Sequence, residues 1–510
     1  MKQEFKFSML PGECWYGACA QSGFEMPFDE SSNHTVQLDP NVTPNQAAPL
    51  LCSNLGRYLW CEEPFDLCVK AGTLILTSRG IPELHEGFGS LRGAYRQAQS
   101  QHFPASQKTP AKKFFVRPQY NTWIEIMYHQ NQKQVLEYAR SMVDNGFEPG
   151  VLMIDDCWSE YYGCWEFDPL KFPDPKAMVR QLHDMGFSVM LWTCPFISPD
   201  SKEFRELEAM DALVKNKDGE AAIIHWWNGY SAALDMTNPK AQDWYAEKNQ
   251  LLMDRYGIDG FKMDAGDGYF YHYEDQMAQP VGPNGQTEAW ARFAARYEYN
   301  ELRACWKNGG QPLMQRLADK NHSWGTGGIA GLIPNELAQG IIGCAFSCPD
   351  MIGGGQYADF QPGAVRFSEE LFVRYAQIAA LMPMMQFSAS PVRVLSKENC
   401  EIVRNMAKLH MQFADTIWAL AEAAARTGEP IVRYLEYGFP HQGLEHITDQ
   451  FMLGEHILVA PVIKEGQRER TVVFPEGTWK SPDGKTYTGP CEAVVPAPLE
   501  CLPYFERCGE

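Results

Sequence analysis

The chain has 510 residues, of which 45% are hydrophobic and 13% aromatic, and it carries a net charge of −20 at pH 7. This length and apolar content predict a globular protein of two or three domains and exclude a disordered chain. The negative charge would repel phosphates, so it argues against a nucleic-acid or anionic-membrane partner and leaves neutral substrates open.

The opening residues, MKQEFKFSMLPGECWYG, contain no apolar run of signal-peptide length, and no later run is long enough for a transmembrane helix. We therefore expect a cytoplasmic protein. The 15 cysteines are scattered through apolar segments, which is typical of buried free thiols. Cys344 and Cys348 have a spacing that zinc ligands can have, but no His or Cys cluster lies nearby to complete the set, so we expect no metal site.

Residues 1–112 contain short β-type runs such as RYLWCEEP and FDLCVKAGTLILTS, separated by turn-forming stretches. This pattern predicts an antiparallel N-terminal β region. The polar segment 98–113 is the best candidate for a linker to the next domain.

Residues 113–390 alternate between strand-like and helix-like patterns. Apolar strands are expected at 150–156, 188–196, 258–266, 311–316 and 340–354, and helices at 175–186 and 238–257. This alternation predicts parallel βα units, and there is room for a (β/α)8 barrel, the TIM barrel. A doubly wound α/β sheet is the alternative, but it usually carries an early Gly-rich phosphate turn, and no GxGxxG follows any of these strands.

Residues 391–510 begin with a helical segment and continue with β-type runs such as DQFMLGEHILVAPVI and RERTVVFPEGTW. They predict a C-terminal β-sandwich domain. The expected fold is thus an α/β protein, a TIM barrel between an N-terminal β region and a C-terminal sandwich.

Polar and aromatic residues gather where the predicted barrel strands end. These residues are Asp155, Asp156, Trp192, Lys262, Asp264, Asp267, Arg316 and Asp350. In parallel barrels the C-terminal strand ends carry the reactive groups, because their loops open to solvent. Each residue alone has an ordinary explanation as a helix cap or solvated surface. Their convergence on one face favours a site, because unpaired charges near a core are costly.

Carboxylates with tryptophans and no metal cluster indicate sugar chemistry. Cleavage of a glycosidic bond needs one carboxylate as nucleophile and a second group that protonates the leaving oxygen. Tryptophan rings stack on pyranose faces, and Asp, Arg and Lys side chains bind hydroxyl groups.

The sequence resembles glycoside hydrolase family 31, the retaining α-glycosidases. The stretches that carry the resemblance are VLMIDDCW, FDPLKFPDPKAMVRQLHDMGFSVMLWTCPFISPDS, DGFKMDAGD, PDMIGGG and DQFMLGEHILVAPVI, which extend over residues 120–480. Within the family, the KMDAGD form is more similar to the α-galactosidase-like branch than to the maltase-type α-glucosidases with their WxDMNE form. The resemblance therefore implies hydrolysis of terminal α-linked hexoses, with α-galactosides favoured, and it gives no reason to expect a cofactor.

Carried over to this chain, the resemblance implies that Asp264 is the nucleophile and that Lys262 binds a sugar hydroxyl from the same strand. Asp155 would bind ring hydroxyls deep in the pocket, with Asp156 beside it, and Trp192 would line the ring pocket.

On the other side of the site, the resemblance implies that Arg316 holds the substrate and orients a carboxylate. Asp350 would complete the floor, Asp267 would act as a partner behind the contact residues, and Trp324 of NHSWGTGG is included among the sugar-binding residues.

The general acid/base is the one place where the chain departs from the family pattern. The Asp expected after the Trp-Gly turn falls on Thr326, and a threonine hydroxyl has no proton to give an alkoxide leaving group at neutral pH. Three explanations stay open. Asp319, Glu336 or Asp359 reaches the leaving oxygen instead, the true substrate has a leaving group that departs unaided, or the chain binds sugar without turning it over.

An active α-glycosidase is the first hypothesis, because the nucleophile strand and the other pocket positions are intact. The alternatives are a catalytically impaired sugar-binding paralogue, or an α-glucosidase, lyase or transglycosylase that uses the same nucleophile. The expected partner is a carbohydrate substrate. Homo-oligomer formation is open, because a missing or reduced N-terminal sandwich would leave apolar surface for a partner subunit.

Overall fold

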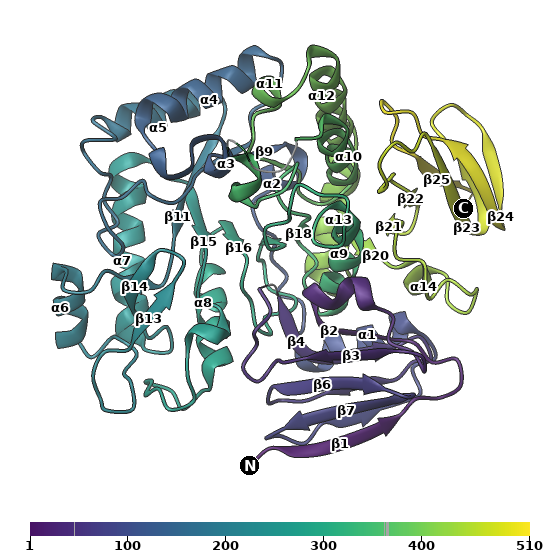
Figure 1. The fold of residues 1–510 in the computed structure, drawn as a ribbon, viewed down its shortest axis with the longest axis horizontal. Helices are drawn as coiled ribbons and strands as arrows, with labels where there is room; N and C mark the ends of the chain where they lie inside the picture. Colours follow the sequence, from purple (N-terminus) through teal and green to yellow (C-terminus); the bar gives the residue numbers. More distant parts are fainter. Residues whose placement is uncertain (45, 362, 364–366, 510) are drawn as a thin grey trace.

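A computed structural model describes residues 1–44, 46–361, 363 and 367–509. Three parts follow one another along the chain: paired N-terminal sheets, a parallel barrel with surrounding helices, and a C-terminal sheet (Figure 1). Within these ranges no helix is both long enough and apolar enough to cross a membrane.

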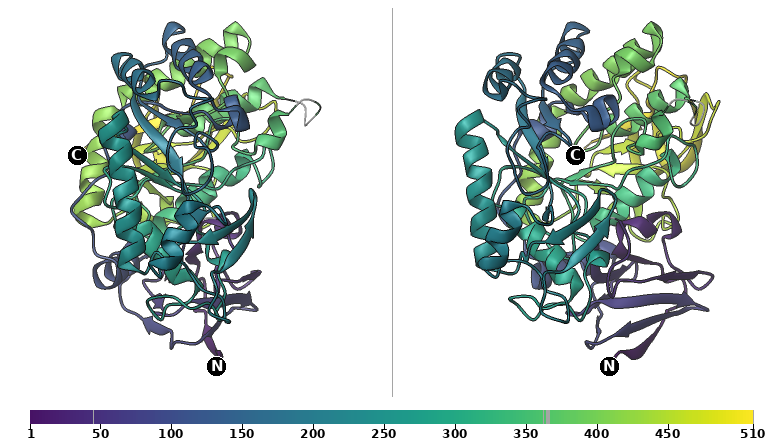
Figure 2. Two further views of the ribbon diagram at one scale, coloured as in Figure 1. Left: turned by 90° about the vertical axis from the view of Figure 1, so that its left-hand side faces the viewer. Right: turned by 60° about the vertical axis from the view of Figure 1, so that its left-hand side comes forward.

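Two four-stranded antiparallel sheets form the N-terminal region, as the sequence predicts. The first sheet contains β1 (Gln3–Ser8), β7 (Thr73–Ser78), β6 (Phe65–Lys70) and β3 (Asn33–Val36). The second contains β2 (Trp15–Cys19), β4 (Ala47–Ser53), β5 (Tyr58–Trp60) and β8 (Glu83–His85). Both views of Figure 2 show these strands at one end of the molecule, beyond the barrel.

Helix α1 (Leu91–His102) follows the sheets and begins at Ser90, whose side chain accepts a hydrogen bond from the Gly93 amide. The predicted linker at 98–113 is therefore partly helical, because its first residues are the last turn of α1.

Eight parallel strands form the barrel, which confirms the predicted fold class. In chain order they are β9 (Gln119–Asn121), β10 (Val151–Ile154), β11 (Ser188–Thr193), β15 (Gly260–Met263), β16 (Tyr299–Leu302), β17 (Gln315–Arg316), β18 (Ser347–Cys348) and β19 (Gln386–Phe387). Strand β19 pairs with β9, and a parallel bridge between Met351 and Gln386 joins β19 to the segment after β18. This bridge closes the barrel.

Helices follow most of the barrel strands and cover the barrel (Figure 1). The main ones are α4 (Gln132–Asp144), α5 (Pro175–Asp184), α7 (Pro239–Tyr256), α8 (Pro283–Ala294), α9 (Leu332–Ile341), α10 (Glu369–Ala380), α12 (Lys397–Gln412) and α13 (Ala414–Thr427). Helix α7 shows both expected end signals, because Asn238 caps its start and Gly257 ends it in the left-handed conformation. A small sheet of β12 (Phe196–Ile197), β13 (Ile223–Trp226) and β14 (Gly229–Ala233) is inserted before α7.

The C-terminal strands form one six-stranded antiparallel sheet. In spatial order it contains β20 (Val432–Arg433), β21 (Phe451–Leu453), β22 (Ile457–Val459), β25 (Tyr504–Cys508), β23 (Glu469–Lys480) and β24 (Thr486–Pro496). A register shift between Phe474 and Gly477 bends β23, and a separate apolar cluster that includes Phe474, Trp479 and Phe505 packs on this sheet.

Arg374 of α10 connects the barrel helices to the C-terminal domain. Its guanidinium is buried and donates to the backbone carbonyls of Gln467 at 2.9 Å, Ala497 at 2.8 Å and Pro498 at 3.3 Å. Burial lowers the pKa of Arg374 to about 10. The charge is therefore held mainly by main-chain oxygens, which would lose their donor if the side chain were removed.

We expect Arg374→Met to lower the free energy of unfolding by about 2–4 kcal/mol, because it leaves several buried carbonyls without a partner. Denaturant unfolding of the variant and the wild type measures the loss. Arg404→Met is a surface control, since Arg404 donates to the Asn145 carbonyl at an exposed position and should change stability by much less. Equal losses in both variants would contradict this interpretation of Arg374.

Candidate active site

The polar residues expected at the strand ends lie together at one end of the barrel. Asp155 and Asp156 directly follow β10, Asp264 directly follows β15, and Arg316 ends β17. The shared end is the C-terminal edge of the strands, as the parallel arrangement requires.

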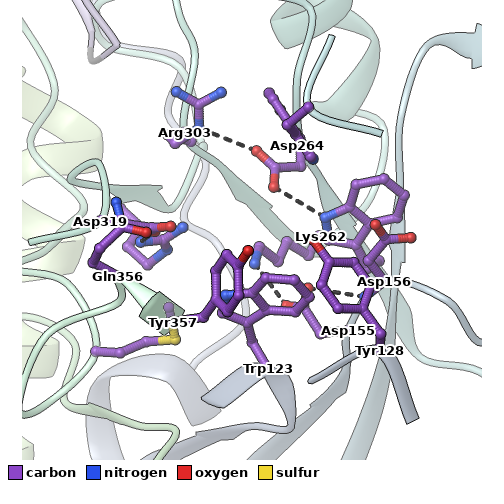
Figure 3. A pocket seen from close by; sticks show the side chains of 14 residues that line it. Trp123, Tyr128, Asp155, Asp156, Lys262, Asp264, Arg303, Asp319, Gln356 and Tyr357 are labelled. Atoms are coloured by element: carbon purple, nitrogen blue, oxygen red, sulfur yellow. Dashed lines mark hydrogen bonds and ion pairs between the residues drawn. The ribbon is translucent and has the colours of Figure 1, made fainter. Parts of the chain in front are cut away.

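A cavity of about 260 Å³ opens at this edge (Figure 3). The side chains that line it are Trp123, Tyr128, Asp155, Asp156, Trp192, Trp227, Lys262, Asp264, Arg303, Arg316, Asp319, Met351, Gln356 and Tyr357. The lining combines aromatic rings with charged groups of both signs, which is the composition that binds a polar ring with apolar faces.

Asp264 is held in place by neighbours on two adjacent strands. Its Oδ2 accepts a hydrogen bond from Trp192 Nε1 at 2.9 Å, and its Oδ1 lies 3.2 Å from Arg303 Nε. Burial alone would raise the pKa of Asp264, but the positive charges of Arg303, Lys262 and Arg316 outweigh it and hold the pKa well below its usual range. Asp264 is thus a largely enclosed carboxylate, with 12% of its side chain exposed, that stays ionised.

Sharp turns follow the carboxylates at the strand ends. Ala265 and Cys157, the residues after Asp264 and Asp156, have φ values of 56° and 73°, and Asp350 itself has a φ of 91°. These left-handed conformations are strained for residues with a Cβ. Two of these turns are stabilised by their own acid, since Asp264 Oδ1 accepts from the Ala265 amide at 2.9 Å and Asp156 Oδ1 accepts from the Cys157 amide at 2.6 Å.

Lys262 and Asp155 form a buried ion pair at the floor of the cavity. Lys262 Nζ lies 2.7 Å from Asp155 Oδ2, and Asn121 donates to the same oxygen at 2.8 Å. Burial by itself would lower the pKa of Lys262, but the charge of Asp155 outweighs it and leaves the pKa above its usual value. Lys262 therefore stays charged, and the contacts fix both side chains.

Asp156 lies beside this pair in a different environment. It accepts hydrogen bonds from Tyr162 Oη at 3.1 Å and from Asn228 Nδ2 at 2.6 Å, and it is almost fully buried. Burial and the neighbouring charge of Asp155 raise the pKa of Asp156 to about 7. Asn228 also places Trp227, the preceding residue, at the cavity wall.

Arg316 organises the opposite side of the cavity. Its Nη1 donates to Asp350 at 2.6 Å and to Asp319 at 2.9 Å. Asp350 is fully buried and also accepts from the amides of Lys320 at 2.7 Å and Gly355 at 2.9 Å, so it ties two loops to Arg316. Asp319 keeps 36% of its side chain exposed and faces the cavity.

Several residues predicted for the site lie outside the cavity lining. Asp267 is buried behind it, where its carboxylate lies 2.7 Å from Arg303 Nη2. Trp324 is half-buried and Thr326 is exposed, and both are on the loop after β17, away from the lining. Asp350 acts through Arg316 rather than at the surface of the cavity.

The three carboxyl groups considered in place of Thr326 lie at different places relative to the cavity lining. Asp319 lines the cavity, whereas Glu336 is buried on α9, and Asp359 accepts from the His322 amide at 2.8 Å outside the lining. Of these three carboxyl groups, Asp319 is the one that lines the cavity.

Sequence reasoning missed Arg303, which contacts both Asp264 and Asp267. It follows β16, a strand whose residues Asn300 and Glu301 are polar, so that no apolar run marks it. Trp227 was missed because it belongs to an inserted hairpin and not to a barrel strand. Among the described residues, no cluster of three or more His, Cys, Asp or Glu side chains is arranged to hold a metal ion.

A parallel barrel with an ionised carboxylate and an aromatic pocket at its C-terminal edge is the arrangement that many glycosidases use. Two family models match the chain and make the assignment specific. Residues 117–420 match the TIM-barrel domain of glycosyl hydrolases family 31, and residues 428–510 match the C-terminal domain of that family. The chain belongs to glycosyl hydrolase family 31.

Individual relatives agree with this assignment. The chain is 33% identical over 418 residues to the myogenesis-regulating glycosidase of Mus musculus, a match that covers 79% of this chain and 58% of the relative. It is 24% identical to alpha-glucosidase 2 of Bacillus thermoamyloliquefaciens, covering 75% of this chain and 52% of that protein. The chain therefore spans between half and three fifths of the length of these two relatives.

Solved structures show the same fold. A dextranase of Flavobacterium johnsoniae complexed with glucose superposes with a TM-score of 0.86 at 19% identity, over 100% of this chain and 67% of that one. An alpha-xylosidase from a soil metagenome complexed with xylose gives a TM-score of 0.85 at 22% identity, over 99% of this chain and 79% of that one.

Asp156 predicts a pH-dependent difference in stability. A carboxyl group with a raised pKa in the folded state stabilises the fold at pH values below its unfolded pKa and loses that contribution as the pH rises towards about 7. We therefore expect Asp156→Asn to gain stability relative to the wild type between pH 4 and pH 7, by on the order of 3 kcal/mol. Urea unfolding of both proteins across this range measures the difference, and a constant difference would show that Asp156 titrates normally.

Proposed function

We propose that the protein is a retaining α-glycosidase that removes a terminal α-linked hexose through a covalent intermediate on Asp264. The observation that carries the proposal is the ionised Asp264 at the wall of a small cavity with a second carboxyl group, Asp319, on the other side (Figure 3). A cavity of about 260 Å³ lies below the usual size of drug-binding pockets, which suits one pyranose ring.

Asp264 has the properties that the nucleophile of a retaining glycosidase needs. A nucleophilic carboxylate must be ionised and must attack the anomeric carbon from the face opposite the leaving group. Arg303 and Trp192 fix its two oxygens, so the attack needs little reorganisation. The bond to the leaving oxygen breaks as the bond from Asp264 to the sugar forms.

Asp319 is our assignment for the general acid/base. It would give its proton to the leaving oxygen in the first step and take a proton from water in the second. Arg316 orients its carboxyl group at 2.9 Å, and its partial exposure leaves a path for water. This assignment explains how the chain functions with Thr326 at the position where the loop pattern predicts an acid.

We further propose an α-galactoside as the substrate. Galactose and glucose differ in the direction of the hydroxyl at C4, and a site discriminates between them by placing a buried hydrogen-bond partner on one side. Asp155, Asp156 and Lys262 supply such partners at one end of the cavity. The KMDAGD sequence, with Lys262 on the nucleophile strand, also supports this choice.

The nucleophile is tested by incubation with 5-fluoro-α-galactosyl fluoride and with its gluco counterpart, followed by mass spectrometry of the intact protein. We expect one hexosyl adduct from the galacto reagent, localised to the peptide that contains Asp264. The fluoride leaves without a general acid, so the result does not depend on Asp319. Asp264→Asn is the control and should remain unlabelled. No adduct from either reagent would overturn the proposed activity, and faster labelling by the gluco reagent would overturn the sugar preference.

The acid/base is tested with Asp319→Ala. We expect a 10²- to 10⁴-fold loss of turnover on a disaccharide, whose leaving group needs protonation, and a smaller effect on the glycosylation step with a dinitrophenyl α-galactoside. Azide should restore turnover of the dinitrophenyl substrate and yield the α-galactosyl azide, because it attacks the intermediate without needing a base.

Thr326→Ala and Asp359→Asn are matched controls on the same side of the barrel, and both should keep turnover within a factor of about three because neither lines the cavity. A large loss in Thr326→Ala, with Asp319→Ala unaffected, would reverse the assignment.

A further inference from the structure

Gln46 lies at the junction between the N-terminal region and the barrel. It precedes β4, and its side chain is completely buried. Its amide Nε2 donates to the backbone carbonyl of Arg303 at 2.7 Å and to that of Arg316 at 3.0 Å. One side chain thus connects the two arginines of the cavity.

The carbonyls of Arg303 and Arg316 depend on the Gln46 amide because strands β16 and β17 stop pairing with each other just before these residues. Among the described residues, β16 and β17 face each other at one register position, Leu302 opposite Gln315. Arg303 and Arg316 are the next residues along each strand, and Gln46 joins their carbonyls where the ladder ends. A buried carbonyl without a donor is costly, so removal of the amide would favour a shift of one or both strand ends.

The residues on either side of Gln46 also contact Arg303 and the chain that follows it. The carbonyl of Pro44 accepts from Arg303 Nη1 at 2.8 Å. The Ala47 amide donates to the Cys305 carbonyl at 3.0 Å, and the Lys307 amide donates back to Ala47 at 3.0 Å. Main chain and guanidinium of Arg303 are therefore both fixed from outside the barrel.

The two arginines contact the two carboxyl groups on which the proposed mechanism depends. Arg303 touches Asp264, and Arg316 touches Asp319. A change in the distance between the strand ends would therefore move the nucleophile and the acid/base relative to each other.

We propose that Gln46 is a positioning residue that sets the spacing between the nucleophile side and the acid/base side of the active site. The inference rests on the proposed glycosidase function. It assigns a role in catalysis to the N-terminal region, which lies outside the segments 117–420 and 428–510 that the family models match.

The test replaces Gln46 by Met, which keeps the length of the side chain and removes both donors. The fraction of working sites is counted by labelling with 5-fluoro-α-galactosyl fluoride, and kcat is then expressed per labelled site on a dinitrophenyl α-galactoside. We expect at least a tenfold loss of kcat per site with a smaller change in KM, because small misplacements of reacting groups slow the chemical steps. Counting sites makes the rate meaningful even if only part of the variant folds.

Gln119→Met is the matched control. Gln119 is also completely buried, and its amide donates to the carbonyls of Lys113, Phe114 and Arg117 at 3.1, 3.2 and 2.7 Å. It begins β9, at the end of the barrel away from the cavity. We expect this variant to lose stability and some labelled sites while kcat per site stays within twofold of the wild type.

A second variant, Gln46→Glu, tests the hydrogen bonds themselves. Its carboxylate form has no proton to donate to the two carbonyls, whereas its protonated form can donate one. We expect kcat per site, divided by the wild-type value at each pH, to rise as the pH falls.

The outcomes separate the two proposals. Wild-type protein that takes no label and releases no sugar would overturn the glycosidase function itself. Normal wild-type activity together with an unchanged kcat per site in Gln46→Met and a flat pH ratio in Gln46→Glu would overturn the role of Gln46 alone.

Discussion

The site depends on Arg303, a largely buried arginine that helps to keep the carboxylate of Asp264 ionised. Burial alone would raise the pKa of Asp264, and a protonated acid is not a nucleophile. Arg303 supplies the opposing charge at contact distance, and it also pairs with Asp267. The order of β15 and β16 in the barrel brings the two strand ends together, so the fold itself creates this pair.

Burial and nearby cations also oppose each other at the other acids around the cavity. Lys262 is paired with Asp155, and Arg316 with Asp319 and Asp350. A contact with a cation does not by itself keep the pKa of a carboxyl group low. Burial raises the pKa of Asp350 to about 6 and that of Asp267 above its usual value, although Arg316 and Arg303 lie beside them. Burial also raises the pKa of Asp156 to about 7 and that of Glu301, whose Oε1 lies 3.4 Å from Arg316 Nε. Asp264 differs from these four acids because the charges of Arg303, Lys262 and Arg316 together outweigh its burial.

The sequence predicted the parts of the site that follow apolar strands. Residues such as Asp155 and Asp264 come directly after buried runs, and a parallel barrel must bring such ends together. Arg303 was missed because β16 contains a buried Asn300 whose side chain binds the carbonyl of Pro312 and the amide of Met314, so the strand lacks an apolar pattern. That Asp319 lines the cavity and Thr326 does not was also beyond the sequence, because it depends on which residue of one loop faces the cavity.

Several of the barrel strands that lead to the cavity are short. Side-chain amides there replace the hydrogen bonds that longer strands would make. Strands β17, β18 and β19 have two residues each. Gln339 of α9 donates to the Gln315 carbonyl at 3.0 Å, Gln386 donates to Glu301 at 2.7 Å, and Gln46 connects Arg303 to Arg316. Short strands leave room for the cavity, but they hold their ends weakly. The positions of the charged groups at the cavity therefore depend on residues from α9 and from the N-terminal region as well as on the barrel itself. For this reason the site cannot be understood from the barrel sequence alone.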